Sequence, residues 1–391
     1  MEATPQLLRN AIDNRITKVR PMATPIDQIS RLAGSRHADS MEVAYYTVDS
    51  KPSSTEVMEN MNVALAEFKP EEGKVFDLVV KDASSFCVTD TVMFPTIEAG
   101  PDKNGVFLTA YVNGVTVEGK NKDKLSLSVA DNFGGNIKAG SKVVRMGRAA
   151  SELDVQTGQY VSIPRRESNY CQIFKMQVEQ STLMRLADKE VGWTFSEQEE
   201  AAVIDMRLGM EKNFLFGCKG RLFDSKKNEY VYITQGIWSQ AGREIELDLN
   251  DITPENFISL CRQIFTGNNG SRKRLLIGGS RFVEAVSKMK TSEKVIFGQM
   301  HNKWGLETRE IITNFGSLYI LHSEVFDQCG HDGDAMVLDQ AFLTKFSHIP
   351  FRPEKLNLRA SGSRNTDAVV LTEAACLVLR NPDVHVRILG C

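Results

Sequence analysis

Five side chains that can bind a metal ion lie close together in one short stretch of the chain. The stretch HSEVFDQCGHDGD contains His322, Cys329, His331, Asp332 and Asp334. Imidazole, thiolate and carboxylate groups are the common protein ligands of transition metals. Because the spacing of these residues matches no common metal site, we interpret the stretch as a surface loop and predict no metal.

A possible anion site lies in the stretch GSRKRLLIGGSR. Three basic residues (272–274) precede a buried strand, and Gly278, Gly279 and Ser280 follow it at the start of a helix. The N–H groups at a helix N-terminus attract anions, but every capped helix offers such a site. We therefore favour a plain strand, turn and helix with a capping serine.

Charged residues crowd the stretch that begins RMGRAASE and ends IPRRES. Arginine outnumbers lysine there, and arginine pairs well with carboxylates across interfaces. Two interpretations remain open, a solvated surface or contact with a partner. The residues concerned are Arg145, Arg148, Glu152, Arg165, Arg166 and Glu167.

No catalytic signature accompanies these groups. The sequence has no GxSxG, GxxxxGK[ST] or HExxH motif, and no GxGxxG after a strand. We therefore predict that the protein is not an enzyme, with no catalytic residue and no cofactor.

Composition narrows the class of protein further. The 391 residues exceed the roughly 250 to 300 at which single cores stop growing, so we expect at least two domains. A net charge of -3 excludes a global field that would bind nucleic acid or anionic lipid. Seven scattered cysteines without a CxxC pair favour a reducing compartment. The N-terminus does not resemble a signal peptide, and no apolar run is long enough for a membrane helix.

Periodicity divides the chain into segments. Asn113-Gly114 lies between alternating runs and predicts a two-residue hairpin turn in a small β-domain. The charged stretch described above predicts an extended hairpin whose polar tip reaches for another surface. We expect a polar arm at residues 1–67, the small β-domain at 68–142 and the extended hairpin at 143–182. A helical region at 183–250, an α/β unit at 251–345 and final strands at 346–391 follow.

One long amphipathic helix, predicted over 196–216, stands among these strands. Ser196 and Glu199 form a capping box, and Val203, Met206 and Met210 belong to one apolar stripe. At 1.5 Å per residue the helix spans roughly 30 Å, enough to cross a whole domain.

This order of segments resembles the major capsid proteins of tailed bacteriophages, which share the Johnson fold. Two stretches carry most of the resemblance, SNYCQIFKMQVEQS leading into EEAAVIDMRLGMEKNFLFG, and EAACLVLRNPDVHVRILG at the end. The resemblance implies an α+β fold in which 196–216 is the spine helix of a peripheral domain. Residues 251–345 would form the axial domain, 346–391 the return strands of the peripheral domain, and 68–142 an extra β-rich segment or insertion.

The resemblance also implies a structural role. Copies would assemble into hexamers and pentamers of an icosahedral shell around double-stranded DNA, which is contacted without sequence readout. A separate scaffolding protein and a portal are expected as partners, with no membrane, and assembly would take place in the bacterial host cytoplasm. The alternatives are the shell of a cellular nanocompartment, similar to an encapsulin, and a soluble two-domain enzyme with its site near residues 322–334.

Contacts between copies would then involve the charged hairpin. Glu197, Glu199 and Glu200 at the exposed start of the helix are the expected partners of its arginines. Some relatives join a lysine of the extended loop covalently to a neighbouring subunit, but residues 148–174 contain no lysine. Lysines that would qualify if the loop lies within the β-rich segment are Lys103, Lys120, Lys122 and Lys124.

Overall fold

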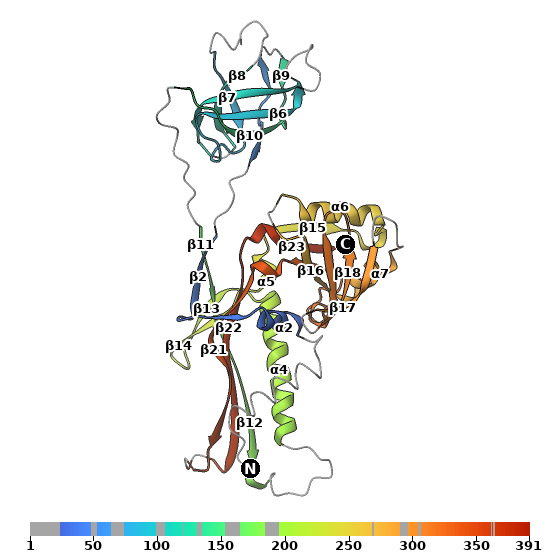
Figure 1. Ribbon diagram of the computed structural model, residues 1–391. Coiled ribbons are helices and arrows are strands. Elements are labelled where there is room, and N and C mark those ends of the chain that lie inside the picture. The colour runs from blue at the N-terminus through green and yellow to red at the C-terminus, as the bar shows by residue number, and fades with distance from the viewer. Residues whose placement is uncertain are drawn as a thin grey trace. The chain divides into compact units, whose positions relative to one another are not determined.

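The computed structural model divides the chain into two compact units. Unit 1 comprises residues 1–47 and 166–391, and unit 2 comprises residues 48–165. The structure describes residues 24–47, 53–63, 74–98, 106–119, 121–130, 135–152, 165–183, 195–267, 270–289, 296–303, 306–360, 362 and 364–391. Figure 1 shows their helices and strands.

Unit 2 is a small β-barrel with its own apolar core. Its main sheet has the order β3-β10-β6-β7-β8-β5, and a bridge between Val57 and Val80 joins its two ends. β4 pairs with β9 beside it. The strands are β3 (Ser54–Glu56), β4 (Met61–Val63), β5 (Phe76–Val80), β6 (Asp90–Glu98), β7 (Phe107–Thr116), β8 (Asp123–Val129), β9 (Gly135–Ile137) and β10 (Lys142–Arg148).

A four-stranded sheet and the long helix form the first layer of unit 1. The sheet has the order β1-β21-β22-β12, and α4 (Phe195–Phe216) packs against it. The helix α2 (Pro25–Leu32) packs against α4 in turn. The strands are β1 (Ser35–His37), β12 (Gln172–Ser181), β21 (Leu343–Asn357) and β22 (Thr366–Leu379).

A seven-stranded mixed sheet forms the second layer of unit 1, with the order β15-β23-β20-β16-β19-β18-β17. Its strands are β15 (Arg243–Leu247), β16 (Lys273–Gly278), β17 (Ile296–Lys303), β18 (Leu306–Ile312), β19 (Ser317–His322), β20 (Ala335–Leu338) and β23 (Val386–Gly390). The remaining helical elements of unit 1 are α5 (Ile237–Gln240), η2 (Leu249–Asp251), α6 (Pro254–Phe265), α7 (Ser280–Lys288), α8 (Glu324–Gln328), η3 (Gln340–Phe342) and η4 (Pro382–Val384).

Two strand pairs complete unit 1. β2 (Glu42–Thr47) pairs with β11 (Arg165–Tyr170), so the barrel is inserted into the chain between these two strands. β13 (Gly220–Asp224) and β14 (Glu229–Ile233) form an antiparallel hairpin after the long helix. Among the described residues, no helix has the length and apolar character needed to cross a membrane.

Several predicted elements are confirmed. The helix α4 begins one residue before the predicted start and ends where predicted, and Val203, Met206, Met210 and Phe214 are buried as expected from their spacing. The structure also shows how α6 starts, because Thr253 accepts a hydrogen bond from the N–H of Asn256 and Pro254 lies in the first turn. The mixture of sheets and helices confirms the α+β fold class.

The predicted extended hairpin over 143–182 is wrong. β10 pairs with β3 and β6 in the barrel, whereas β11 pairs with β2 and β12 pairs with β22. Alternation along these strands indicated their type, but it carries no information about which strand pairs with which. Asn113-Gly114 is not a turn either, because β7 runs through it with a bulge between Val112 and Gly114.

Two further predicted segments, the arm over 1–67 and the return strands over 346–391, do not each form one part of the structure. Residues 1–23 lie outside the described residues, but Ile26 and Ile29 of α2 are 0% exposed within unit 1. β3 and β4, at residues 54–63, belong to the barrel. β23, expected with the return strands, lies in the seven-stranded sheet.

Candidate functional site

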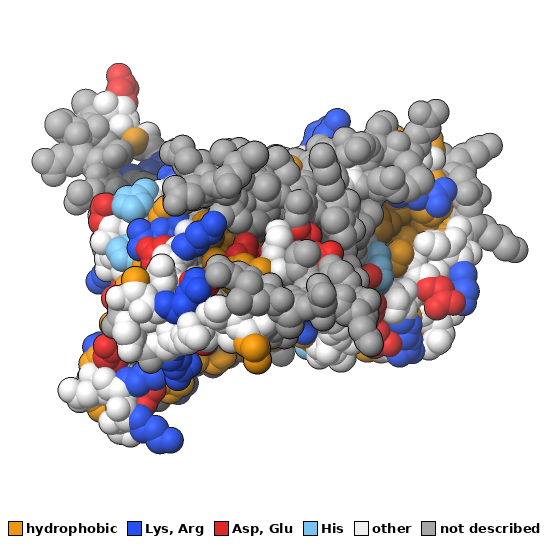
Figure 2. Space-filling model, turned by 90° about the horizontal axis from the view of Figure 1, so that it is seen from below, with side chains coloured by type: hydrophobic (Ala, Val, Ile, Leu, Met, Phe, Trp, Pro, Cys, Tyr) orange, Lys and Arg blue, Asp and Glu red, His pale blue; other side chains and the backbone are white. Residues whose placement is uncertain are grey.

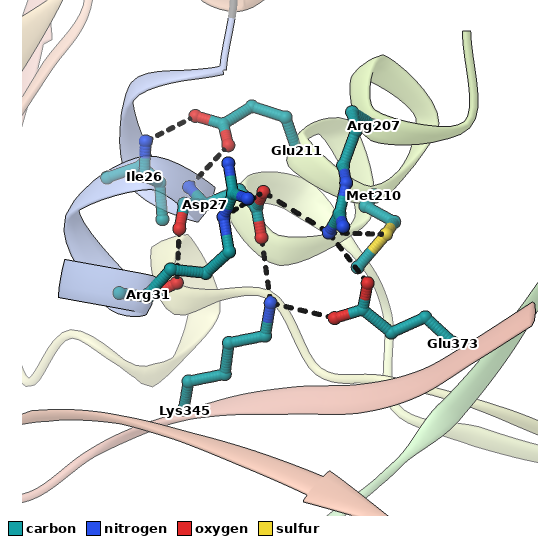
Figure 3. Close-up of polar contacts among 9 residues, drawn as sticks. Ile26, Asp27, Arg31, Arg207, Met210, Glu211, Lys345 and Glu373 are labelled. Atoms are coloured by element: carbon teal, nitrogen blue, oxygen red, sulfur yellow. Dashed lines mark hydrogen bonds and ion pairs between the residues drawn. The ribbon is translucent and has the colours of Figure 1, made fainter. Parts of the chain in front are cut away.

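A network of buried charges joins α2, α4 and the four-stranded sheet (Figure 3). Lys345 Nζ lies 2.8 Å from Asp27 Oδ1 and 2.9 Å from Glu373 Oε1. An Arg207 guanidinium nitrogen lies 2.6 Å from Glu373 Oε2 and 3.4 Å from Asp27 Oδ2. All four side chains are at most 4% exposed. The network therefore links four chain segments, from α2, α4, β21 and β22.

Charge compensation keeps this network ionised although it is buried. Burial opposes ionisation of Asp27, but the positive charges of Lys345, Arg207 and Arg31 hold the pKa of Asp27 well below its usual range. Burial likewise opposes the charge of Lys345, yet Asp27 and Glu373 raise its pKa. Each charge would be strongly unfavourable here without its partners.

Glu211 of α4 caps the first turn of α2. Its two carboxylate oxygens accept hydrogen bonds of 2.8 Å from the backbone N–H groups of Ile26 and Asp27. Burial raises the pKa of Glu211 to about 8, although the two N–H donors lower it. Thr24 is the N-cap residue of α2, but its side chain forms no capping hydrogen bond. Glu211, from another element, therefore caps the helix.

Two of the predicted contact residues pair with an acidic residue of their own unit. Arg145 lies 4.0 Å and Arg148 3.6 Å from carboxylate oxygens of Asp90, which is 2% exposed. Arg145 also donates a hydrogen bond of 2.8 Å to the Ser85 carbonyl. Because β10 is a barrel strand, these arginines are not at the tip of an extended hairpin.

The other predicted contact residues of the charged stretch are divided between the two units, and their role in contacts between copies stays a prediction. Glu152 is exposed, and the side chain of Arg165 lies outside the described residues. Arg166 is exposed and, with Glu167 and Tyr45, lines a polar cavity of about 410 Å³. Burial and the neighbouring Glu167 raise the pKa of Tyr45.

The helix start at residues 197–200 is less exposed than predicted. Glu199 is 4% exposed, and burial raises its pKa, whereas Glu197 and Glu200 are half-buried. The expectation of an exposed acidic helix start is wrong for Glu199, because α4 begins at Phe195 and packs this face inward.

The stretch with metal-ligand residue types forms two separate His–Asp hydrogen bonds. His322 Nε2 lies 2.9 Å from Asp327, and His331 Nδ1 lies 2.6 Å from Asp334. The His331 ring also stacks on Phe216 with centroids 4.7 Å apart. Within the described part of the chain, no three potential ligands gather around one point.

The possible anion site is already occupied by the protein's own groups. Asp327 Oδ1 accepts a hydrogen bond of 2.7 Å from the N–H of Ser280 at the start of α7. Arg274 is 1% exposed and donates to the carbonyls of Ile264 and Val384. Within the described residues, the polar groups of both stretches therefore contact other groups of the chain, which stabilises the seven-stranded sheet and its helices.

The β13–β14 hairpin is an apolar surface that the sequence interpretation missed. Phe223 and Tyr230 lie opposite each other with ring centroids 5.1 Å apart, and Leu222 lies opposite Val231 on the other face. Their exposed fractions are 54%, 52%, 57% and 45%. The stretches RLFD and EYVYI contain consecutive apolar residues, a pattern that is typical of strands buried on both faces. This pattern was the sequence signal from which the apolar surface could have been predicted.

Comparison with known proteins shows to which protein family the chain belongs. A family model described as the SU10 major capsid protein matches residues 2–391. The chain belongs to this family. No curated protein matches the sequence.

Several solved structures are distantly similar to this capsid protein. The capsid of an empty GTA particle has 10% identity and a TM-score of 0.42, with 63% of this chain and 81% of that chain covered. A chain of Gordonia phage Cozz has 15% identity, a TM-score of 0.39 and coverage of 63% and 79%. The SrpI encapsulin of Synechococcus elongatus has 10% identity, a TM-score of 0.38 and coverage of 59% and 76%.

Family membership confirms that the protein is a structural shell protein and not an enzyme. Its location is the virion capsid, and its copies oligomerise into capsomers. The soluble-enzyme alternative is therefore wrong. The buried charges described above consequently serve to build a subunit, and the exposed hairpin becomes the candidate assembly surface.

Proposed function

We propose that this capsid protein assembles into hexamers and pentamers of a closed icosahedral shell that encloses double-stranded DNA. A separate scaffolding protein and a portal take part in assembly, which occurs in the bacterial host cytoplasm. The full-length family match supports the shell role. The exposed apolar hairpin β13–β14 is the observation that supports specific contact between copies.

A two-stranded hairpin with both faces exposed requires additional contacts. Isolated hairpins are marginally stable in water, and exposed apolar patches mark interaction sites. Arg221 already lies over the Tyr230 ring, 3.8 Å from its centroid, and Tyr170 contacts Tyr232 with centroids 5.3 Å apart. Among the described residues, Leu222 and Phe223 remain 57% and 54% exposed, so we assign a second copy of this chain as the partner of their outer parts.

DNA contact without sequence readout agrees with the charge distribution. On the face that Figure 2 shows, both basic and acidic side chains occur among the described residues. A mixed surface produces no large field of one sign. The enclosed DNA is then held by confinement and by scattered phosphate contacts, and not by a dedicated binding site.

Substitution within the hairpin tests the proposal. Phe223→Ser with Tyr230→Ser should reduce particle yield by at least tenfold, because each lost contact recurs at every subunit of the shell. The thermal melt of the unassembled subunit should change little, since both side chains are mostly exposed. Sedimentation gives the yield, and Phe107→Ser, at an exposed phenylalanine of the barrel, is the matched control.

Two outcomes would contradict the proposal. Wild-type yield from the double variant would show that the hairpin lies on a bare surface of the shell. Purified shells that contain a protein cargo and no DNA would identify a nanocompartment, which was the alternative that the sequence left open.

A further inference from the structure

Two buried cysteines lie opposite each other where the β2–β11 pair joins the four-stranded sheet. Cys171 is the single residue between β11 and β12. The antiparallel register places Gln172 opposite Ala375, so Cys171 lies opposite Cys376 of β22. Their Sγ atoms are 3.6 Å apart, and both residues are 0% exposed.

The backbone geometry at this pair suits a disulfide bond. Directly opposed residues in antiparallel strands have Cα atoms about 4.5 to 5.5 Å apart, which lies within the range that disulfides accept. A disulfide bond measures about 2.0 Å, so the sulfurs need to approach by only about 1.6 Å. Rotation of the two side chains provides such a movement without a change of strand register.

We propose that Cys171 and Cys376 are a redox pair that forms an intramolecular disulfide when the protein meets a small-molecule disulfide such as oxidised glutathione. The pair is a modification site whose substrate class is a dialkyl disulfide. This inference does not depend on how the copies of the chain assemble.

The reaction proceeds by two thiol–disulfide exchanges. The Cys171 thiolate attacks one glutathione sulfur, forms a mixed disulfide and releases the first glutathione as a thiolate. The Cys376 thiolate then attacks Cys171 Sγ and displaces the second glutathione. Two protein thiols lose two electrons and two protons, and one oxidised glutathione becomes two reduced molecules.

The contact between the two thiols favours Cys171 as the first nucleophile. The hydrogen bond with Cys376 lowers the pKa of the Cys171 thiol, whereas the same contact and burial raise that of Cys376. Ala38, Val43 and Tyr45 cover the pair on the side of β2. The reagent therefore reaches the sulfurs when this covering segment opens locally, which makes the reaction slower than oxidation of exposed cysteines.

A bond at this position would stiffen the base of the β2–β11 pair. Cys171 N–H donates a hydrogen bond of 2.7 Å to the Met41 carbonyl, so the residue already connects β12 with the segment that leads into β2. Linking it to Cys376 attaches this point to a central strand of the four-stranded sheet. The cross-link also closes a long loop, which restricts the unfolded chain.

The test uses the full chain with its more accessible thiols removed. In the background variant, Cys87, Cys218, Cys329 and Cys391 are replaced by serine, because these are the cysteines that are not buried. After incubation with oxidised glutathione, we expect the loss of two free thiols and a Cys171–Cys376 cross-linked peptide in mass spectra. We also expect a melting temperature several degrees higher, which dithiothreitol reverses.

The matched control is Cys376→Ala in the same background, which should show no cross-linked peptide and no reversible rise in melting temperature. Mass spectrometry of the wild-type protein provides a readout that needs no variant. An unchanged thiol count, or glutathione attached to Cys171 without a cross-link, would overturn the proposal.

Discussion

At the scale of single residues, the molecule depends on a few buried charges that the sequence interpretation did not predict. Asp27 and Lys345 are separated by 318 positions, and each is an ordinary charged residue in its local stretch. Residue types and their spacing in the sequence reveal interacting side chains on one helix or in one loop, such as His331 and Asp334. They do not reveal partners that meet only because a sheet and two helices pack together.

Removing one member of the buried network should destabilise the subunit strongly. Lys345→Met leaves Asp27 and Glu373 with less compensation, so we expect a loss of about 3 to 5 kcal/mol in the free energy of unfolding. The same substitution at Lys288, whose ion-paired side chain is 73% exposed, should change it by about 0 to 1 kcal/mol. Urea unfolding of the unassembled subunit measures both. Equal losses would show that the network is not buried.

Glu211 should make stability depend on pH. Its pKa rises from 4.5 to about 8 on folding, so the folded state binds more protons between these values. The free energy of unfolding should therefore fall as pH rises through this window, by an amount on the order of a few kcal/mol. In Glu211→Gln the group cannot titrate, so this part of the decline should vanish. Parallel curves for the two proteins, measured by urea unfolding, would contradict the assignment.

At the scale of elements, local periodicity predicted whether a segment is a helix or a strand better than it predicted which elements pack or pair together. The stripe through Val203, Met206 and Met210 predicted α4 because a helix repeats every 3.6 residues whatever it packs against. The pairing of β2 with β11 was missed because a whole barrel separates them in sequence. The position expected for Arg145 and Arg148 on an extended hairpin is wrong for the same reason, since their strand belongs to the barrel, whereas their contact with another copy stays a prediction.

The helix α2 offers a test of whether the N-terminal segment belongs to its own subunit. Ile29→Ala should lower the free energy of unfolding of the unassembled subunit by about 2 to 5 kcal/mol, because Ile29 is 0% exposed. Leu32→Ala on the same helix removes a side chain that is 60% exposed and should change it by about 0.5 kcal/mol or less. Denaturation curves that coincide for Ile29→Ala and wild type would mean that neighbouring subunits order this segment.

At the scale of the whole molecule, each of the two units has its own core. Alternating strands in the sequence predicted a small β-domain over 68–142. The barrel also needs β3, which lies wholly outside this range, and β10, which lies almost wholly outside it. The backbone bond from Met58 N–H to the Val79 carbonyl helps to close the barrel and removes free sheet edges.

A closed barrel with a separate core should fold by itself. We expect residues 48–165, expressed alone, to give a single cooperative thermal transition and dispersed amide signals in NMR spectra. Leu127→Ala, in its core, should lower the melting temperature of this fragment. A fragment without a cooperative transition would show that the barrel requires unit 1.

Electron cryo-microscopy of particles purified from their natural source tests the central claim most directly. If this capsid protein forms the shell through its exposed hairpin, the reconstruction will show a closed icosahedral shell around DNA. Leu222, Phe223, Tyr230 and Val231 will be buried against a neighbouring copy in every capsomer. A shell in which these four side chains face solvent, or material that contains only small oligomers, would contradict it.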